Sequence, residues 1–225
     1  MLDEAGEPVG GFGYAACVNA PAFKEWFYPL VTAAVQDSGA DGILLDEPKR
    51  ASTPCFCPVC REIAESSRRE DLALLREQSM AEMMGKTSAA VKAIAPSNST
   101  IAMLGPKNSD HFVEALAEQA DLDAIGFDAP PCAKAGSVSN SRKPSVFDAA
   151  LRVLPRVRRN GKKTFVLVET FFIPASSHAE LEANMARLTE VEADIFSFNY
   201  YGQEVQDPEF VMGVTRQTIE RLRAG

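Results

Sequence analysis

The sequence has no long hydrophobic run and no excess of basic residues. No apolar stretch approaches the roughly 20 residues that are needed to cross a bilayer. The opening residues, MLDEAGEPVGG, lack the basic and apolar regions of a signal peptide. The formal net charge is −8, which argues against binding to nucleic acid or to an anionic membrane surface, because both need basic groups. We therefore expect a protein with neither nucleic acid nor membrane among its partners.

The glycine patterns of nucleotide-binding folds are also missing, since neither G-x-G-x-x-G nor a P-loop occurs. Short apolar runs alternate with amphipathic segments, which predicts parallel strands joined by helices, as a doubly wound sheet or a (β/α)8 TIM barrel. Polar and acidic residues follow several of the runs, where a barrel has its active site, so we favour the barrel. The expected strands are residues 11–18, 42–47, 100–105, 124–129, 164–171 and 195–201; the expected helices are 21–38, 58–94 with a break near Gly85, 109–120, 144–159, 176–192 and 208–223.

Six strands are two fewer than a closed barrel requires, and 225 residues are fewer than its typical length of about 250. We therefore expect the α/β chain to be a partial TIM barrel, one domain over residues 1–225, with six βα units that correspond to strands three to eight. On this view the first two βα units are missing. The alternative is an open six-stranded sheet that buries its edges by association, as in a homo-oligomer.

Two glutamates end strands in this numbering: Glu47 ends strand four and Glu169 ends strand seven. Retaining glycoside hydrolysis uses two carboxyl groups about 5–5.5 Å apart, one as acid/base and one as nucleophile. Opposite ends of a narrow barrel mouth could hold that separation. The alternative interpretation is that these carboxylates cap loops or pair with nearby cations such as Lys49.

Cysteine is scarce and clustered: three of the five cysteines lie in CFCPVC, as Cys55, Cys57 and Cys60. This clustering favours a metal site in a reducing compartment over a disulfide framework, so we expect a cytoplasmic location. Zinc needs four ligands, and Cys17 is the natural fourth candidate, with Cys132 as second choice. Four thiolates leave no open coordination position, which predicts a structural zinc. Thiol redox chemistry is the competing interpretation of the motif.

The segments YAACVNAPAFKEWF (14–27), DEP (46–48) and CFCPVC (55–60) resemble the zinc-containing β-galactosidases of glycoside hydrolase family 42. They resemble, more loosely, barrel hydrolases with a D-E-P loop followed by C-x-C-x-x-C. The resemblance implies a TIM-barrel glycosidase with Glu47 as acid/base and Glu169 as nucleophile. It also implies four thiolate ligands to zinc, namely Cys17, Cys55, Cys57 and Cys60. The chain departs from that family at Asp46, where the family has an asparagine that binds the sugar 2-hydroxyl.

Further residues at strand ends are candidates for binding a carbohydrate substrate. Asp46, Asp128 and Asn199 could hydrogen-bond sugar hydroxyls, and Tyr200 could stack on a sugar face. The two histidines, His111 and His178, are expected on the surface. We therefore predict a retaining glycoside hydrolase of unknown specificity. The alternative is a non-catalytic carbohydrate-binding or degenerate barrel in which four cysteines and zinc only hold a loop.

Overall fold

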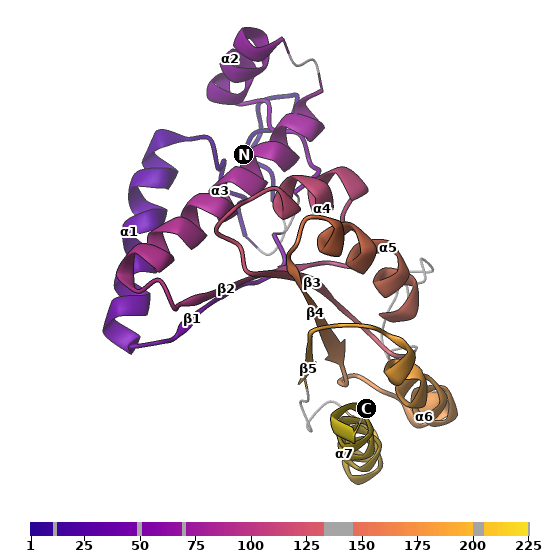
Figure 1. The fold of residues 1–225 in the computed structure, drawn as a ribbon. Coiled ribbons are helices and arrows are strands. Elements are labelled where there is room, and N and C mark those ends of the chain that lie inside the picture. Colours follow the sequence, from indigo (N-terminus) through magenta and orange to yellow (C-terminus); the bar gives the residue numbers. More distant parts are fainter. Residues whose placement is uncertain (11–12, 49–50, 69–70, 133–145, 200–204, 225) are drawn as a thin grey trace. The chain divides into compact units, whose positions relative to one another are not determined.

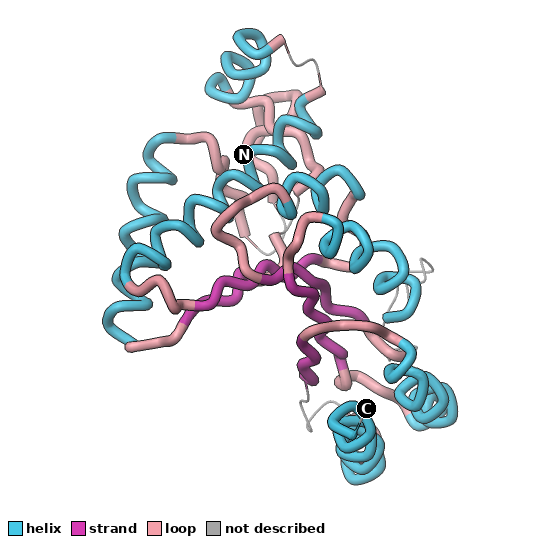
Figure 2. The backbone as a smooth tube through the Cα atoms, viewed as in Figure 1, coloured by secondary structure: helices cyan, strands magenta, loops and turns pink. Residues whose placement is uncertain are grey.

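The computed structural model describes residues 1–10, 13–48, 51–68, 71–132, 146–199 and 205–224. Within these ranges helices and strands alternate along most of the chain (Figures 1 and 2). The chain divides into two compact units, Met1–Met103 with Asn108–Ile125, and Leu104–Lys107 with Gly126–Gly225. None of the described helices is both long and apolar enough to span a membrane.

The described strands form one sheet in which the strand order follows the chain, β1-β2-β3-β4-β5. β1 runs parallel to β2, and β4 runs parallel to β5. A doubly wound sheet reverses its strand order at a switch point, whereas sequential order is the connectivity of a barrel wall. The predicted α/β fold with helix-connected parallel strands is therefore confirmed, with the strand order of part of a TIM barrel. The strands are β1 (Gly42–Leu45), β2 (Ser99–Leu104), β3 (Ala124–Ala129), β4 (Lys163–Glu169) and β5 (Ile195–Asn199).

The first of the six predicted strands does not form in the part of it that the structure describes. Residues 13–18 contain no strand. The N–H of Ala15 instead donates to the carbonyl of Val9 at 2.9 Å, and the carbonyl of Ala15 accepts from the amino group of Met1. The segment is thus tied to the preceding residues rather than to a sheet. The prediction of six strands was wrong for the described chain, which has five.

Local signals set the ends of the helices in the first unit. α1 (Pro21–Ser38) starts with a proline and ends at Gly39, whose left-handed backbone (φ 63°) closes its last turn. α3 (Leu72–Ile94) starts after Asp71, whose carboxylate accepts hydrogen bonds from two N–H groups of the first turn. α1 and α3 lie side by side, and α3 contacts β1 (Figure 1). α2 (Pro58–Ser67) and α4 (Asp110–Ala117) complete this unit.

The predicted helix over residues 58–94 is broken, but not at Gly85. α2 ends at Ser67, Arg68 has a left-handed backbone (φ 53°), and α3 begins at Leu72. Gly85 lies inside α3, where an added Cβ would come within 2.3 Å of the side-chain oxygen of Gln119. The glycine therefore makes room for a neighbouring side chain instead of ending a helix.

Two threonine–aspartate pairs fix the start of strands. In the first unit the Asp123 carboxylate accepts from the backbone N–H of Thr100 at 2.8 Å and from its hydroxyl at 3.2 Å. In the second unit Asp194 accepts from the N–H of Thr164 at 2.7 Å and from its hydroxyl at 2.6 Å. Asp123 directly precedes β3 and Asp194 directly precedes β5. Their threonine partners are the second residues of the strands before these, β2 and β4. The pairs join successive strands at their amino ends, away from the predicted site.

In the second unit the helices are α5 (Val146–Arg159), α6 (His178–Ala186) and α7 (Pro208–Ala224), with short 3-10 turns at Ala175–Ser177 and Arg187–Glu190. α5 buries residues spaced three and four apart, which is the pattern of an amphipathic helix. These residues are Val146, Ala149, Ala150, Val153, Leu154 and Val157.

Candidate metal centre and strand-end carboxylates

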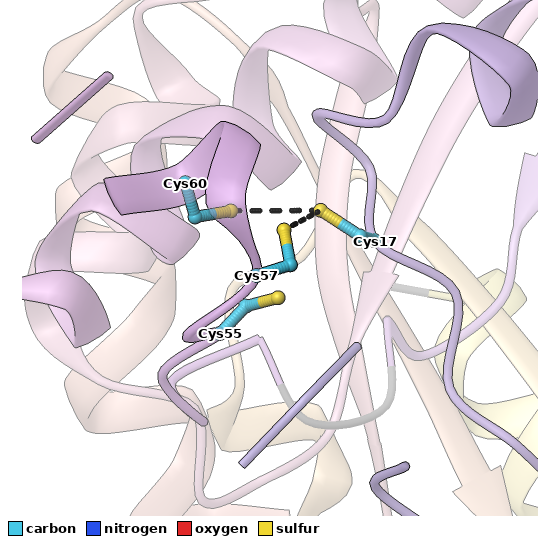
Figure 3. Close-up of side chains that lie close together, drawn as sticks. All are labelled: Cys17, Cys55, Cys57 and Cys60. Atoms are coloured by element: carbon cyan, nitrogen blue, oxygen red, sulfur yellow. Dashed lines mark hydrogen bonds between the residues drawn. The ribbon is translucent and has the colours of Figure 1, made fainter. Parts of the chain in front are cut away.

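Four cysteines from two segments of the chain converge in the first unit (Figure 3). Cys17 precedes α1, Cys55 and Cys57 lie in the loop after β1, and Cys60 lies in the first turn of α2. Pro58 at the first position of α2 starts the helix directly after Cys57, which turns Cys60 back toward the loop.

The spacing of the four sulfur atoms suits a single tetrahedral ion. All four Sγ atoms lie within 4.8 Å of one another. The Sγ of Cys17 is 3.5 Å from that of Cys60 and 3.6 Å from that of Cys57. A zinc–sulfur distance of about 2.3 Å gives a sulfur–sulfur edge of about 3.8 Å in a regular tetrahedron. These separations are also far longer than a disulfide bond of about 2.05 Å, and no disulfide forms among the described residues. The cluster could hold a metal ion.

The electrostatics of the cluster favour thiolate at one position. Hydrogen bonding from the Cys60 thiol lowers the pKa of Cys17 to about 4. The same bond raises the pKa of Cys60, and burial raises the pKa of Cys57. Cys17 is thus the thiol that most readily loses its proton, with its neighbours as donors. Cys17, Cys55 and Cys60 are buried, so this charge lies in a low-dielectric environment.

Cys17, and not Cys132, is the fourth member of the cluster. Cys132 is also buried, but it belongs to the second unit and is not among the clustered thiols. The sequence expectation of four converging cysteines is therefore confirmed at the level of geometry.

The two predicted catalytic carboxylates follow strands, one in each unit. Glu47 lies two residues beyond the end of β1 and is half-buried, and Asp46 beside it is exposed. Glu169 is the last residue of β4 and is 6% exposed. In the sheet register Glu169 is opposite Asn199, the last residue of β5. Their roles in catalysis stay predictions.

Asp46 and Glu47 stand at a pocket of about 710 Å³ that lies within the first unit. α1, β1 and α3 form its walls, and most of the lining is apolar. Aromatic residues of α1 and three methionines of α3 contribute to it: Phe23, Phe27, Met80, Met83 and Met84. This pocket is therefore less polar than a sugar-binding cleft that relies on hydroxyl contacts.

The remaining predicted substrate contacts are at strand ends as well. Asp128 lies in β3, next to its last residue, and is buried. Asn199 ends β5 and is half-buried. Tyr200 lies outside the described residues. The proposed contacts of these residues with a carbohydrate remain predictions.

Sequence reasoning missed a polar cluster around Glu77, a residue of α3 that is only 2% exposed. Its carboxylate accepts from the hydroxyl of Ser109 at 2.7 Å and from the hydroxyl of Ser52, and it lies 2.7 Å from Nδ1 of His111. His111 is indeed exposed, as predicted, but it is held by a buried acid. A signal was present: Glu77 falls on the same stripe of α3 as Met80 and Met84 and other buried residues at helical spacing.

Comparisons with known proteins find similarity in structure and none in sequence. No protein-family model and no curated protein matches the chain. The glycoside hydrolase domain of PelA from Pseudomonas aeruginosa is similar with a TM-score of 0.48 at 15% identity, covering 83% of this chain and 63% of that one. The catalytic domain of β-amylase from Paenibacillus polymyxa has a TM-score of 0.46 at 14% identity, covering 96% and 57%. CitE from Mycobacterium tuberculosis has a TM-score of 0.35 at 12% identity, covering 84% and 92%. The chain thus spans less than two thirds of the first two proteins.

Proposed function

We propose that residues 1–225 are a partial TIM-barrel domain of a retaining glycoside hydrolase whose loop after β1 is held by structural zinc. The thiol cluster supports this proposal most directly. Two of its members lie on the loop that begins with Asp46 and Glu47, and a third lies in the first turn of the helix that follows, so a metal there would fix the segment after a candidate acid/base. The resemblance of the D-E-P and C-x-C-x-x-C segments to family 42 glycosidases points to the same arrangement. The substrate is a glycoside or oligosaccharide.

In the proposed reaction Glu47 gives a proton to the leaving oxygen, and Glu169 attacks the anomeric carbon. Glu169 suits a held nucleophile because it ends a strand that is hydrogen-bonded to β5. Asp46 accepts a sugar hydroxyl in place of the asparagine of the resembling family. Asp128, Asn199 and Tyr200 supply the other contacts with the sugar.

Zinc, when bound by four thiolates, has no open position for substrate and supplies folding energy only. The residues that would hold it are Cys17, Cys55, Cys57 and Cys60, whose sulfurs have suitable separations. The ion stabilises the turn from the loop into α2, because ligands before and within that helix share it.

The test is turnover of a panel of aryl glycosides by wild type, Glu47→Gln and Glu169→Gln. We expect each substitution to lower kcat by at least about 10²-fold, because general acid/base catalysis contributes about 10²–10⁴-fold. Glu62→Gln, at an exposed position of α2, is the control and should be neutral. Azide should rescue Glu169→Ala and give a glycosyl azide of inverted configuration. If the wild type hydrolyses none of the glycosides in the panel, the proposed glycoside hydrolase activity is contradicted.

A second function, carbohydrate binding without catalysis, is favoured by one observation. Asp46 stands where the resembling family has the asparagine that binds the sugar 2-hydroxyl. If the protein binds carbohydrate without catalysis, we expect Glu47→Gln and Glu169→Gln to bind oligosaccharides with wild-type affinity. Neither the wild type nor the variants should then hydrolyse the substrate. Isothermal titration with the same glycosides separates this outcome from hydrolysis.

A further inference from the structure

Arg76 is a buried cation for which the described residues provide no carboxylate. The residue is 3% exposed and lies in α3. Its Nη2 atom donates to the carbonyl of Ala16 at 3.4 Å, while Nε and Nη1 are buried without a hydrogen-bond partner among the described residues. The adjacent buried acid, Glu77, is occupied by Ser109, His111 and Ser52. Arg76 also lines the pocket of Asp46 and Glu47 but forms no hydrogen bond with either of them, so a further source of negative charge is needed to compensate the guanidinium.

The four clustered thiols are the candidate for that source, because they act electrostatically on Arg76. Ala16, whose carbonyl Arg76 contacts, is the neighbour of Cys17 in the sequence. Burial lowers the pKa of Arg76, and negative charge on the four cysteines opposes this shift. A divalent ion with four thiolates has a net charge of about −2. An isolated buried charge is strongly unfavourable, so such a centre and a buried guanidinium stabilise each other.

A second residue of α3 reaches the cluster on the same face of the helix. Ser79 follows Arg76 by three positions, which places both on one side. The side-chain amide of Asn19 donates to the hydroxyl of Ser79 at 3.0 Å and lies 3.5 Å from the Sγ of Cys60. α3 thus contributes one cation, and its Ser79 accepts a hydrogen bond from the Asn19 amide that also donates to Cys60. Donors of this kind orient metal ligands and tune their charge.

We propose that Arg76 is the counter-ion of a tetrathiolate metal centre, so that metal binding and burial of Arg76 depend on each other. This inference rests on the proposed metal site. It predicts that the site takes divalent, thiophilic ions with tetrahedral preference. It also predicts that Arg76 favours the four-thiolate form and is unfavourable when the cysteines are neutral thiols.

The experiment measures Zn²⁺ affinity by chelator competition in wild type, Arg76→Met and Arg76→Lys, and thermal midpoints with and without Zn²⁺. Arg76→Met removes the charge and keeps much of the volume. We expect it to weaken Zn²⁺ binding by about 10–100-fold, as substitutions around metal ligands do. Without Zn²⁺ it should raise the thermal midpoint above that of wild type, because the unpaired cation is gone. Arg76→Lys keeps the charge and should retain most of the affinity.

Lys86→Met is the matched control, because Lys86 is a cation of the same helix, α3, but is exposed to water. Its charge is screened by solvent, and we expect unchanged Zn²⁺ affinity. If Arg76→Met binds Zn²⁺ with wild-type affinity, the counter-ion role is overturned. It is also overturned if this variant has a lower thermal midpoint than wild type without Zn²⁺, because that result indicates that Arg76 only contributes to packing. If Arg76→Met does not accumulate as folded protein, Arg76→Gln serves for the same comparison. A wild type that binds no Zn²⁺ overturns the metal site and the counter-ion together, whatever the glycosidase assay gives.

Discussion

Substitution of the buried acid Glu77 by glutamine tests whether one carboxylate joins three segments of the first unit. The carboxylate accepts from Ser109 and Ser52 and pairs with His111. Hydrogen bonds to charged groups contribute about 1.5–3 kcal/mol each. Glutamine keeps one acceptor oxygen and the shape but loses the charge, so all three contacts weaken.

The expected loss is smaller than three full bonds, because some of the donors return to water. Ser52 is exposed, and the side chain of His111 is 45% exposed. We therefore expect Glu77→Gln to lower the free energy of unfolding by about 3 kcal/mol, against a total of about 5–15 kcal/mol for a typical protein. For a chain of this length this corresponds to a fall in Tm of about 6–12 °C.

Urea denaturation and thermal melts followed by circular dichroism measure the effect. Glu82→Gln is the control, because Glu82 is an exposed residue of the same helix and accepts one hydrogen bond, from Gln78. Its expected effect lies within about 0.5 kcal/mol, as for most surface substitutions. A Glu77→Gln variant as stable as wild type would refute the idea that an ionised Glu77 holds the Ser52 loop and α4 against α3.

Three further predictions concern the sheet and the metal. Hydrogen bonds from the hydroxyl and then the N–H of Thr164 lower the pKa of Asp194. The ionised carboxylate therefore stabilises the folded protein at pH values above its unfolded pKa of about 3.9, and this stabilisation is lost as the pH falls through the folded pKa. Asp194→Asn should therefore lower Tm at pH 7 and approach wild type as the pH falls through the folded pKa of Asp194; a pH-independent difference would contradict this. At Gly126 an added Cβ would lie 1.7 Å from the carbonyl oxygen of Phe165, so Gly126→Ala should destabilise by about 1–3 kcal/mol or more. Gly213→Ala, in open space on α7, should stabilise by up to about 1 kcal/mol in the same urea titration. Chelation of bound zinc should lower Tm, and added Zn²⁺ should restore it; an unchanged Tm on loss of the metal contradicts a structural role.

Five of the six predicted strands form because their sequences carry the signal of strands buried within a sheet. The run at residues 11–18, GFGYAACV, has a weaker strand signal, because among the described residues 13–18 only Val18 is β-branched. Gly13 has a φ of 133°, a conformation that favours glycine. The residues that follow, Cys17 and Val18, are buried, and Cys17 belongs to the thiol cluster. Packing of Cys17 in the thiol cluster thus accompanies a loop at an apolar pattern that is too short to decide between strand and loop.

The strand ends that bear Glu47 and Glu169 could be predicted from the sequence, because the order of residues along one strand is local information. The convergence of Cys17 with CFCPVC could also be predicted, since tetrahedral coordination requires a fourth ligand. The environment of Glu77 and Arg76 could not. Helical spacing places Glu77 on the buried stripe of α3, but only the three-dimensional contacts of α3 reveal which acceptors and donors surround Glu77 and Arg76.

The adjacent positions of Arg76 and Glu77 explain how α3 holds the loop that starts at Glu47. Glu77 binds the hydroxyl of Ser52 near the middle of the loop. Arg76 donates to the carbonyl of Ala16, beside Cys17, and the charges of the clustered cysteines act on it. Neither contact depends on the sheet, so β1 fixes where the loop begins, and α3 fixes the course that it takes. A substitution of either residue should therefore disturb the loop while β1 remains paired with β2, because that pairing is made by backbone groups.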